Sequence, residues 1–143
     1  MTVHILGIDP GASTGLAAFT SGALGFLKTI EPHTIEHTLR HYKPARVVFE
    51  DSRLESKVWT AAGSRAAALK IARNVGQIDA WCGLITAICA DLGIPAHGIS
   101  PTAKGAKLDA EAFALVTGWA ARSNQHERDA AMVAWPYRRV KHG

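Results

Sequence analysis

The sequence predicts an α/β protein in which helices cover a mixed β-sheet of about five strands. Two short apolar runs, at 3–8 and 45–50, have the continuous hydrophobic character of strands that are buried on both faces. A third run, from about 64 to 92, repeats apolar residues at three- and four-residue steps, as amphipathic helices do. Three strands come first, and helices and strands then alternate, which indicates a layered sheet rather than a bundle.

The first strand is the run VHILGI at 3–8, and a tight turn marked by Pro10-Gly11 and Gly15 follows it. The segments 16–20 and 23–30 flank Ser21-Gly22, a dipeptide typical of a hairpin turn. The chain therefore opens with a central strand followed by a hairpin.

The second buried strand is predicted at 45–51, the run ARVVFED, after a short helix from about Thr34 to Tyr42. Pro44 ends that helix, because proline disfavours helical conformation in the residue before it. The strand finishes in two carboxylates, Glu50 and Asp51, and the polar segment 52–63 is predicted to be a loop.

The long helix is predicted to run from about Ser64 to Leu92 and to end at Gly93 and Pro95. Its apolar stripe is expected to face the core and comprises Ala67, Ile71, Val75, Ile78, Cys82, Ile85, Cys89 and Leu92. Beyond it we expect a short strand at 96–100 and a helix at 108–118. Asn124 is predicted to cap a last helix, with Glu127 at capping-box spacing.

The 143 residues are enough for one domain, 1–143, with a core that needs no disulfide. Cys82 and Cys89 are seven residues apart in the helical pattern, so we expect buried thiols in a reducing, cytoplasmic compartment. No signal peptide opens the sequence, and no uncharged run reaches the roughly 18 residues that a membrane span needs.

Positive charge is unevenly distributed, although the net charge is only +4. Lys28 is the one Lys or Arg before residue 40, and 74–103 contains none, so the cations fall in two blocks at 40–73 and 104–143. The blocks could converge on one face that binds a polyanion, or they could be ordinary solvated surface.

Four side chains of metal-ligating type occur at informative positions. Asp9 and Glu50 follow the two buried strands, and parallel neighbours would bring them to one edge of the sheet. His126 and Asp129 are three residues apart in the last helix and hence on one face. Carboxylates with one imidazole suit Mg²⁺ or Mn²⁺, and two such ions would support hydrolysis of a phosphodiester.

Each of these residues also has a purely structural interpretation. Asp9 before Pro-Gly could be a turn residue, and Glu50 with Asp51 could be a charged strand end. His126 could be a surface histidine, and Asp129 could complement a helix dipole. The metal-site hypothesis depends on the four occurring together.

The ordered motifs resemble those of RuvC-like Holliday-junction resolvases from Val3 to about Trp135. They are ILGIDPGASTGLAAF, VVFED, NVGQIDAWCGLITAICADLGIPAHGISPTAKGAK and HERDAAMVAW. The resemblance implies a ribonuclease-H-like fold, a homodimer, and divalent-metal-dependent cutting of four-way DNA junctions. The short C-terminus would suit a phage-encoded member.

The resemblance implies catalytic and metal-binding roles for Asp9, Glu50, His126 and Asp129. The lysines before the last helices match Lys104 and, less closely, Lys107, which could contact the scissile phosphate. Residues expected to bind DNA phosphates are Arg53, Lys57, Arg65, Lys70, Arg73 and Lys107.

Many members of the family carry an aromatic residue directly after the glutamate motif, whereas this chain has Leu54 near that place and Trp59 further on. Either residue could act as an apolar wedge, and Trp59 could equally pack its loop onto the core. Whether Asp51 assists or replaces Glu50 is left open, as are any helicase partner and any preference for a cutting sequence.

The leading hypothesis is a structure-selective endonuclease that resolves Holliday junctions by paired symmetric nicks. A nuclease of the same fold that cuts other branched DNA or RNA–DNA hybrids is the second hypothesis. A non-catalytic DNA-binding or nucleotide-binding module is the third.

Overall fold

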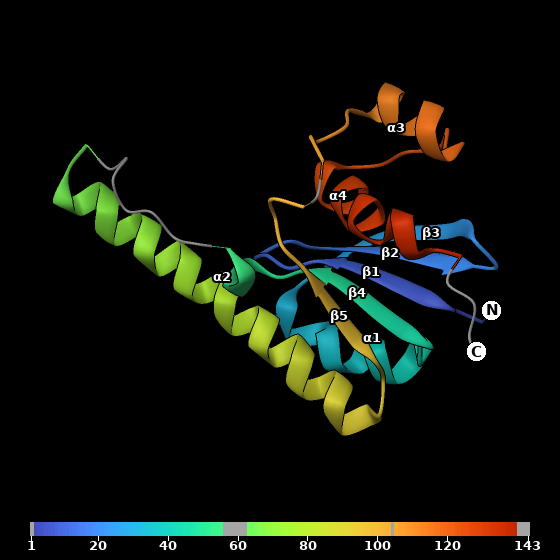
Figure 1. Cartoon of the computed structure of the whole chain (residues 1–143), viewed down its shortest axis with the longest axis horizontal. Coiled ribbons are helices and arrows are strands. Elements are labelled where there is room, and N and C mark those ends of the chain that lie inside the picture. Colours follow the sequence, from blue (N-terminus) through green and yellow to red (C-terminus); the bar gives the residue numbers. More distant parts are fainter. Residues whose placement is uncertain (1, 56–62, 104, 140–143) are drawn as a thin grey trace.

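The computed structural model describes residues 2–55, 63–103 and 105–139 and contains a five-stranded mixed sheet in the order β3-β2-β1-β4-β5. The sheet separates two helical layers (Figure 1). One face carries α1 and α2, and the opposite face carries α4 with α3 beyond it. The predicted fold class is confirmed.

The strands are β1 (Ile5–Asp9), β2 (Thr14–Thr20), β3 (Ala23–Ile30), β4 (Arg46–Glu50) and β5 (Ala96–Ile99). β1 pairs antiparallel with β2 and parallel with β4, and β4 pairs parallel with β5. The central position of β1 explains its apolar run, because both of its faces are covered. The predicted hairpin is β2–β3, whose turn residues Ser21 and Gly22 have φ values of 51° and 82°, as a type I′ turn requires.

The helices are α1 (Ile35–Tyr42), α2 (Arg65–Leu92), α3 (Ala110–Thr117) and α4 (Gln125–Ala134), with 3₁₀ turns η1 (Pro32–Thr34), η2 (Ser52–Leu54) and η3 (Trp135–Tyr137). Side chains cap the N-termini of three of the four α-helices, at Ser64, Asp109 and Asn124. The capping box between Asn124 and Glu127 is present as predicted.

Alternation along the strands assigns each side chain to one of the two layers. In β1, Leu6 and Ile8 lie in the core beneath α1 and α2, whereas Ile5 lies in the core beneath α4. In β4, Val47 and Phe49 face α1 and α2, and Val48 faces α4. By the same alternation Asp9 and Glu50 belong to the α4 face.

The long helix α2 is buried over only part of its length. Cys82, Ile85 and Cys89 are fully buried against the sheet, and both cysteines are free thiols as expected. The N-terminal half extends beyond the sheet (Figure 1), and there Ile71 is 43% exposed. The prediction that the whole stripe faces the core is therefore wrong for Ala67 and Ile71, because no element of the described fold lies over them.

By length and composition α2 could cross a membrane: an 18-residue window has a mean hydropathy of 1.3, and 22% of that window is buried. Its C-terminal half packs on the sheet, and its side chains hydrogen-bond to η2. Those contacts identify it as part of the layer that covers the sheet.

Candidate active site

Asp9 and Glu50 lie at the carboxyl ends of neighbouring parallel strands. Ile8 pairs with Phe49 in the β1–β4 register, so the following residues, Asp9 and Glu50, emerge side by side from the sheet. Both line a pocket of about 450 Å³ that also includes Pro101, His126 and Asp129. The predicted convergence of the two strand ends is therefore observed.

Helix α4 supplies the remaining two groups and approaches the sheet very closely. A Cβ atom on Gly7 would collide with the carbonyl oxygen of Ala130, and one on Gly15 would collide with that of His126. Because these strand positions are glycines, the first turn of α4 lies directly on β2 and the second turn lies directly on β1. The His126 Nδ1 atom is then 3.6 Å from the Asp9 Oδ2 atom.

Asp129 lines the same pocket and is almost fully buried. Its side chain is 6% exposed, its Oδ1 atom accepts a 2.8 Å hydrogen bond from Gln125 Nε2, and its Oδ2 atom lies 3.3 Å from Lys107 Nζ. Lys107 is thus turned toward the carboxylates, with most of its side chain in solvent. That position allows it to face a phosphate that enters the pocket.

The chemistry of the pocket fits a hard divalent cation. Three carboxylates and an imidazole come from three elements and share one cavity, which is the donor set that Mg²⁺ or Mn²⁺ accepts. Within the described residues, no three His, Cys, Asp or Glu side chains form a group that could hold an ion. The residues share a pocket, and their side chains are not gathered into a coordination shell.

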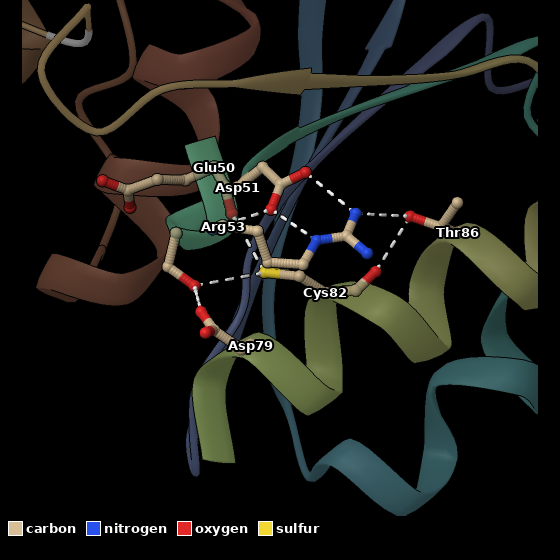
Figure 2. Close-up of polar contacts among 7 residues, drawn as sticks. Glu50, Asp51, Arg53, Asp79, Cys82 and Thr86 are labelled. Atoms are coloured by element: carbon tan, nitrogen blue, oxygen red, sulfur yellow. Dashed lines mark hydrogen bonds and ion pairs between the residues drawn. The ribbon is translucent and has the colours of Figure 1, made fainter. Parts of the chain in front are cut away.

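Asp51 does not join this pocket and faces α2 on the other side of the sheet (Figure 2). It is 4% exposed and forms an ion pair with Arg53, with a 2.9 Å distance between Nε and Oδ1. The hydrogen bond from the Arg53 guanidinium lowers the pKa of Asp51 below its ordinary value, although burial acts in the opposite direction. Asp51 is thus buried against Arg53 and does not line the pocket that Glu50 lines.

The predicted DNA-binding residues do not share one environment. Arg65, Lys70 and Arg73 are exposed on the projecting half of α2, whereas the Arg53 guanidinium is engaged by Asp51 and Thr86. The structure thus gives Arg53 an intramolecular role that the sequence did not predict.

Leu54 is 57% exposed, as a wedge would have to be. The predictions for Lys57, Trp59 and Lys104 lie outside the described residues.

Sequence reasoning missed Gln125 and Arg128, which support the site from within α4. Gln125 is four residues before Asp129, and that helical spacing could have revealed the contact. Arg128 donates from Nε to the Leu108 carbonyl and from Nη1 to the Ser123 carbonyl, both at 2.9 Å. These bonds tie the chain on either side of α3 to α4, a long-range arrangement that no local pattern encodes.

Comparison with known proteins gives matches only among solved structures. No protein-family model and no curated protein matches the chain. RuvC from Thermus thermophilus in complex with a Holliday junction substrate matches with a TM-score of 0.61 and 20% identity over 94% of this chain and 91% of that chain. A second Thermus thermophilus RuvC structure matches with a TM-score of 0.59 and 16% identity over 92% and 90%.

The comparison confirms the RuvC-like, ribonuclease-H-like fold that the motifs implied. Both matches extend over nearly the full length of both chains, so the likeness includes the sheet and its covering helices. At this level of identity the likeness establishes the fold, and the chemistry has to be argued from the residues of the pocket.

Proposed function

We propose that this protein is a metal-dependent endonuclease that cuts four-way DNA junctions by paired symmetric nicks. One observation carries the proposal: Asp9, Glu50, His126 and Asp129 come from three separate elements and line one pocket. The pocket lies at the carboxyl ends of β1 and β4, where open α/β sheets place their sites. The likeness to a RuvC bound to a Holliday junction supports the choice of DNA substrate.

In this proposal the four side chains hold Mg²⁺ or Mn²⁺, two ions per site, with Asp9 central between Glu50 and the α4 pair. When bound, such ions supply an activated water and stabilise the leaving oxygen of the phosphodiester. The chain's own contribution is to orient the donors from rigid elements and to present cationic side chains to the phosphate. The contact between Lys107 Nζ and Asp129 Oδ2 supports this role for Lys107, and we assign a similar one to Lys104.

The remaining DNA contacts are proposed on the projecting half of α2, where Arg65, Lys70 and Arg73 are exposed. Phosphate contacts of this kind give affinity without reading sequence, which suits recognition of a branched shape. We also propose a homodimer, since a two-fold substrate needs two related cuts. Ala67 and Ile71 continue the buried stripe of α2 beyond the sheet, where both are exposed, and they offer an apolar surface for that contact.

The proposal is tested by incubating purified protein and Mg²⁺ or Mn²⁺ with an end-labelled four-way junction, a linear duplex, a flap and an RNA–DNA hybrid. Paired nicks at symmetric positions in the junction alone are the expected result. Equal cutting of flaps or hybrids would replace junction resolution with the broader nuclease hypothesis. Binding of the junction without cutting of any substrate would contradict catalysis.

A further inference from the structure

The three residues after Glu50 connect the candidate active site to α2 on the opposite side of the sheet. Glu50 lines the α4 pocket, and the next side chain, Asp51, points to the other face. The Asp51 backbone N–H still extends the β4–β5 pairing, with a 2.8 Å bond to the Ile99 carbonyl. The chain is therefore held as a strand through Asp51 and then turns into η2.

Arg53 returns over Asp51 and holds its carboxylate in a bidentate pair (Figure 2). Nε donates to Oδ1 and Nη2 donates to Oδ2, both at 2.9 Å, and the Arg53 backbone N–H donates to Oδ1 at 3.1 Å. A Cβ atom on Gly98 of β5 would lie 2.8 Å from Asp51 Oδ2, so a glycine there leaves room for the pair. Bidentate, charge-assisted pairs are the most directional hydrogen bonds available to these groups.

Three residues on one face of α2 form hydrogen bonds with this turn and with the end of β4. Asp79 accepts a 2.6 Å hydrogen bond from Ser52 Oγ, and Thr86 accepts one of 3.0 Å from Arg53 Nη2. Between them, the Cys82 thiol donates to the carbonyl of Glu50 itself, with 3.6 Å between sulfur and oxygen. The backbone of Glu50 is thus bonded directly to α2 (Figure 2).

We propose that Asp51 and Arg53 are positioning residues, which fix the end of β4 against α2 so that Glu50 is held toward the metal-binding pocket. This inference rests on the proposed function. Neither Asp51 nor Arg53 lines the pocket. Their ion pair acts on Glu50 through the backbone, because Asp51 directly follows Glu50 in the chain.

The test compares Arg53→Gln and Asp51→Asn with wild-type protein and with Arg40→Gln, which breaks an exposed 3.4 Å ion pair to Glu36 on α1. Mn²⁺ affinity of the DNA-free protein is measured by electron paramagnetic resonance. Junction affinity is measured without divalent ions, and kcat and KM are measured with Mg²⁺. Loss of a residue that orients a ligand typically weakens metal affinity or activity by about 10–100-fold.

We expect both variants to lose about tenfold or more in Mn²⁺ affinity and in kcat, with junction affinity within about twofold of wild type. Arg53→Lys should recover only part of the loss, because an ammonium keeps the charge and lacks the planar fork. Thr86→Val removes one hydrogen bond and leaves the ion pair, so it supplies a milder change if the pair variants fail to fold. It should lower kcat without changing junction affinity.

Unchanged Mn²⁺ affinity and kcat in all these variants would overturn the inference. So would a loss of junction affinity in Arg53→Gln with metal affinity unchanged, since that result would make Arg53 a phosphate contact. If the wild-type protein binds Mn²⁺ and cuts nothing, the proposed function fails, and the Mn²⁺ affinities of the variants still decide the positioning role. If the wild-type protein does not bind Mn²⁺, both fail.

Discussion

At the scale of single residues, the direction of each carboxylate follows from its position along its strand. Asp9 continues the series Ile5 and Gly7 on the α4 face, and Glu50 continues Val48 on the same face. A slip of one residue would turn these carboxylates toward α2. The sequence predicted that both strands end in carboxylates. The sequence could not show whether Glu50 or Asp51 faces the pocket, because that depends on which helix covers each face of the sheet.

Also at the scale of a single residue, the burial of Cys89 predicts how the stability of the fold depends on pH. It is fully buried, and burial raises the pKa of its thiol to about 11, above the ordinary value of 9.0. The folded state therefore holds this proton more tightly than the unfolded state. The resulting stabilisation is complete below pH 9 and is lost as pH rises toward 11.

The expected result is that the advantage of wild type over Cys89→Ala in unfolding free energy shrinks by about 2 kcal/mol between pH 8 and 10.5. Urea unfolding at a series of pH values measures this difference. Comparison with the variant cancels the titration of surface lysines and tyrosines. An advantage that stays constant to pH 10.5 would show that the buried thiol does not govern alkaline stability.

At the scale of elements, α4 is the part of the site that local sequence patterns predicted best. The capping box at Asn124 and Glu127 and the spacing of His126 and Asp129 were all visible in the sequence. The close approach of α4 to the sheet was not, because Gly15 was interpreted only as part of a turn. The reason for that glycine is a contact with a helix more than a hundred residues later in the chain.

Gly15→Ala is predicted to damage the site through α4. The added methyl group meets the His126 carbonyl, so the first turn of α4 must move away from β2, at a cost of about 1–3 kcal/mol. Thermal unfolding should show this loss, and junction cleavage should fall further than junction binding. Gly76→Ala is the matched control, since its added methyl group meets nothing within 4 Å and alanine favours the helix. Equal behaviour of the two variants would contradict the close contact.

Hydrophobic periodicity predicted the extent of helix α2 but only part of its packing. Its boundaries and its buried C-terminal half were predicted, whereas the exposure of Ile71 was not. A three- to four-residue repeat identifies an apolar face but does not say what covers it. The contacts of Asp79 and Thr86 with η2 were equally invisible, because they join polar residues about thirty positions apart.

At the scale of the whole molecule, one half of α2 projects beyond the sheet (Figure 1), and this half carries three exposed cationic side chains. Replacing Arg65, Lys70 and Arg73 together with glutamine should weaken junction binding. Each lost phosphate contact should also reduce the slope of log affinity against log salt by about 0.9. Fluorescence anisotropy at several salt concentrations measures both effects. Lys28→Gln on β3 is the control, and an unchanged slope in the triple variant would place the DNA elsewhere.

The proposed homodimer is also a property of the whole molecule. Ala67 and Ile71 are exposed, although they lie on the stripe of α2 that packs on the sheet further along the helix. Sedimentation equilibrium is expected to give twice the 15.3 kDa mass of the chain. Ala67→Lys with Ile71→Lys should shift the equilibrium toward monomers. A wild-type protein that remains monomeric at micromolar concentration would contradict the dimer.

The most direct test of the central claim is cleavage of an end-labelled four-way junction in Mg²⁺ by wild type and by Asp9→Asn. The substitution removes one carboxylate charge from the pocket and leaves the exposed cations of α2 in place. We expect paired symmetric nicks by wild type, with cleavage abolished in the variant and junction binding retained. Cleavage by Asp9→Asn at the wild-type rate would remove Asp9 from the mechanism and contradict the proposed site.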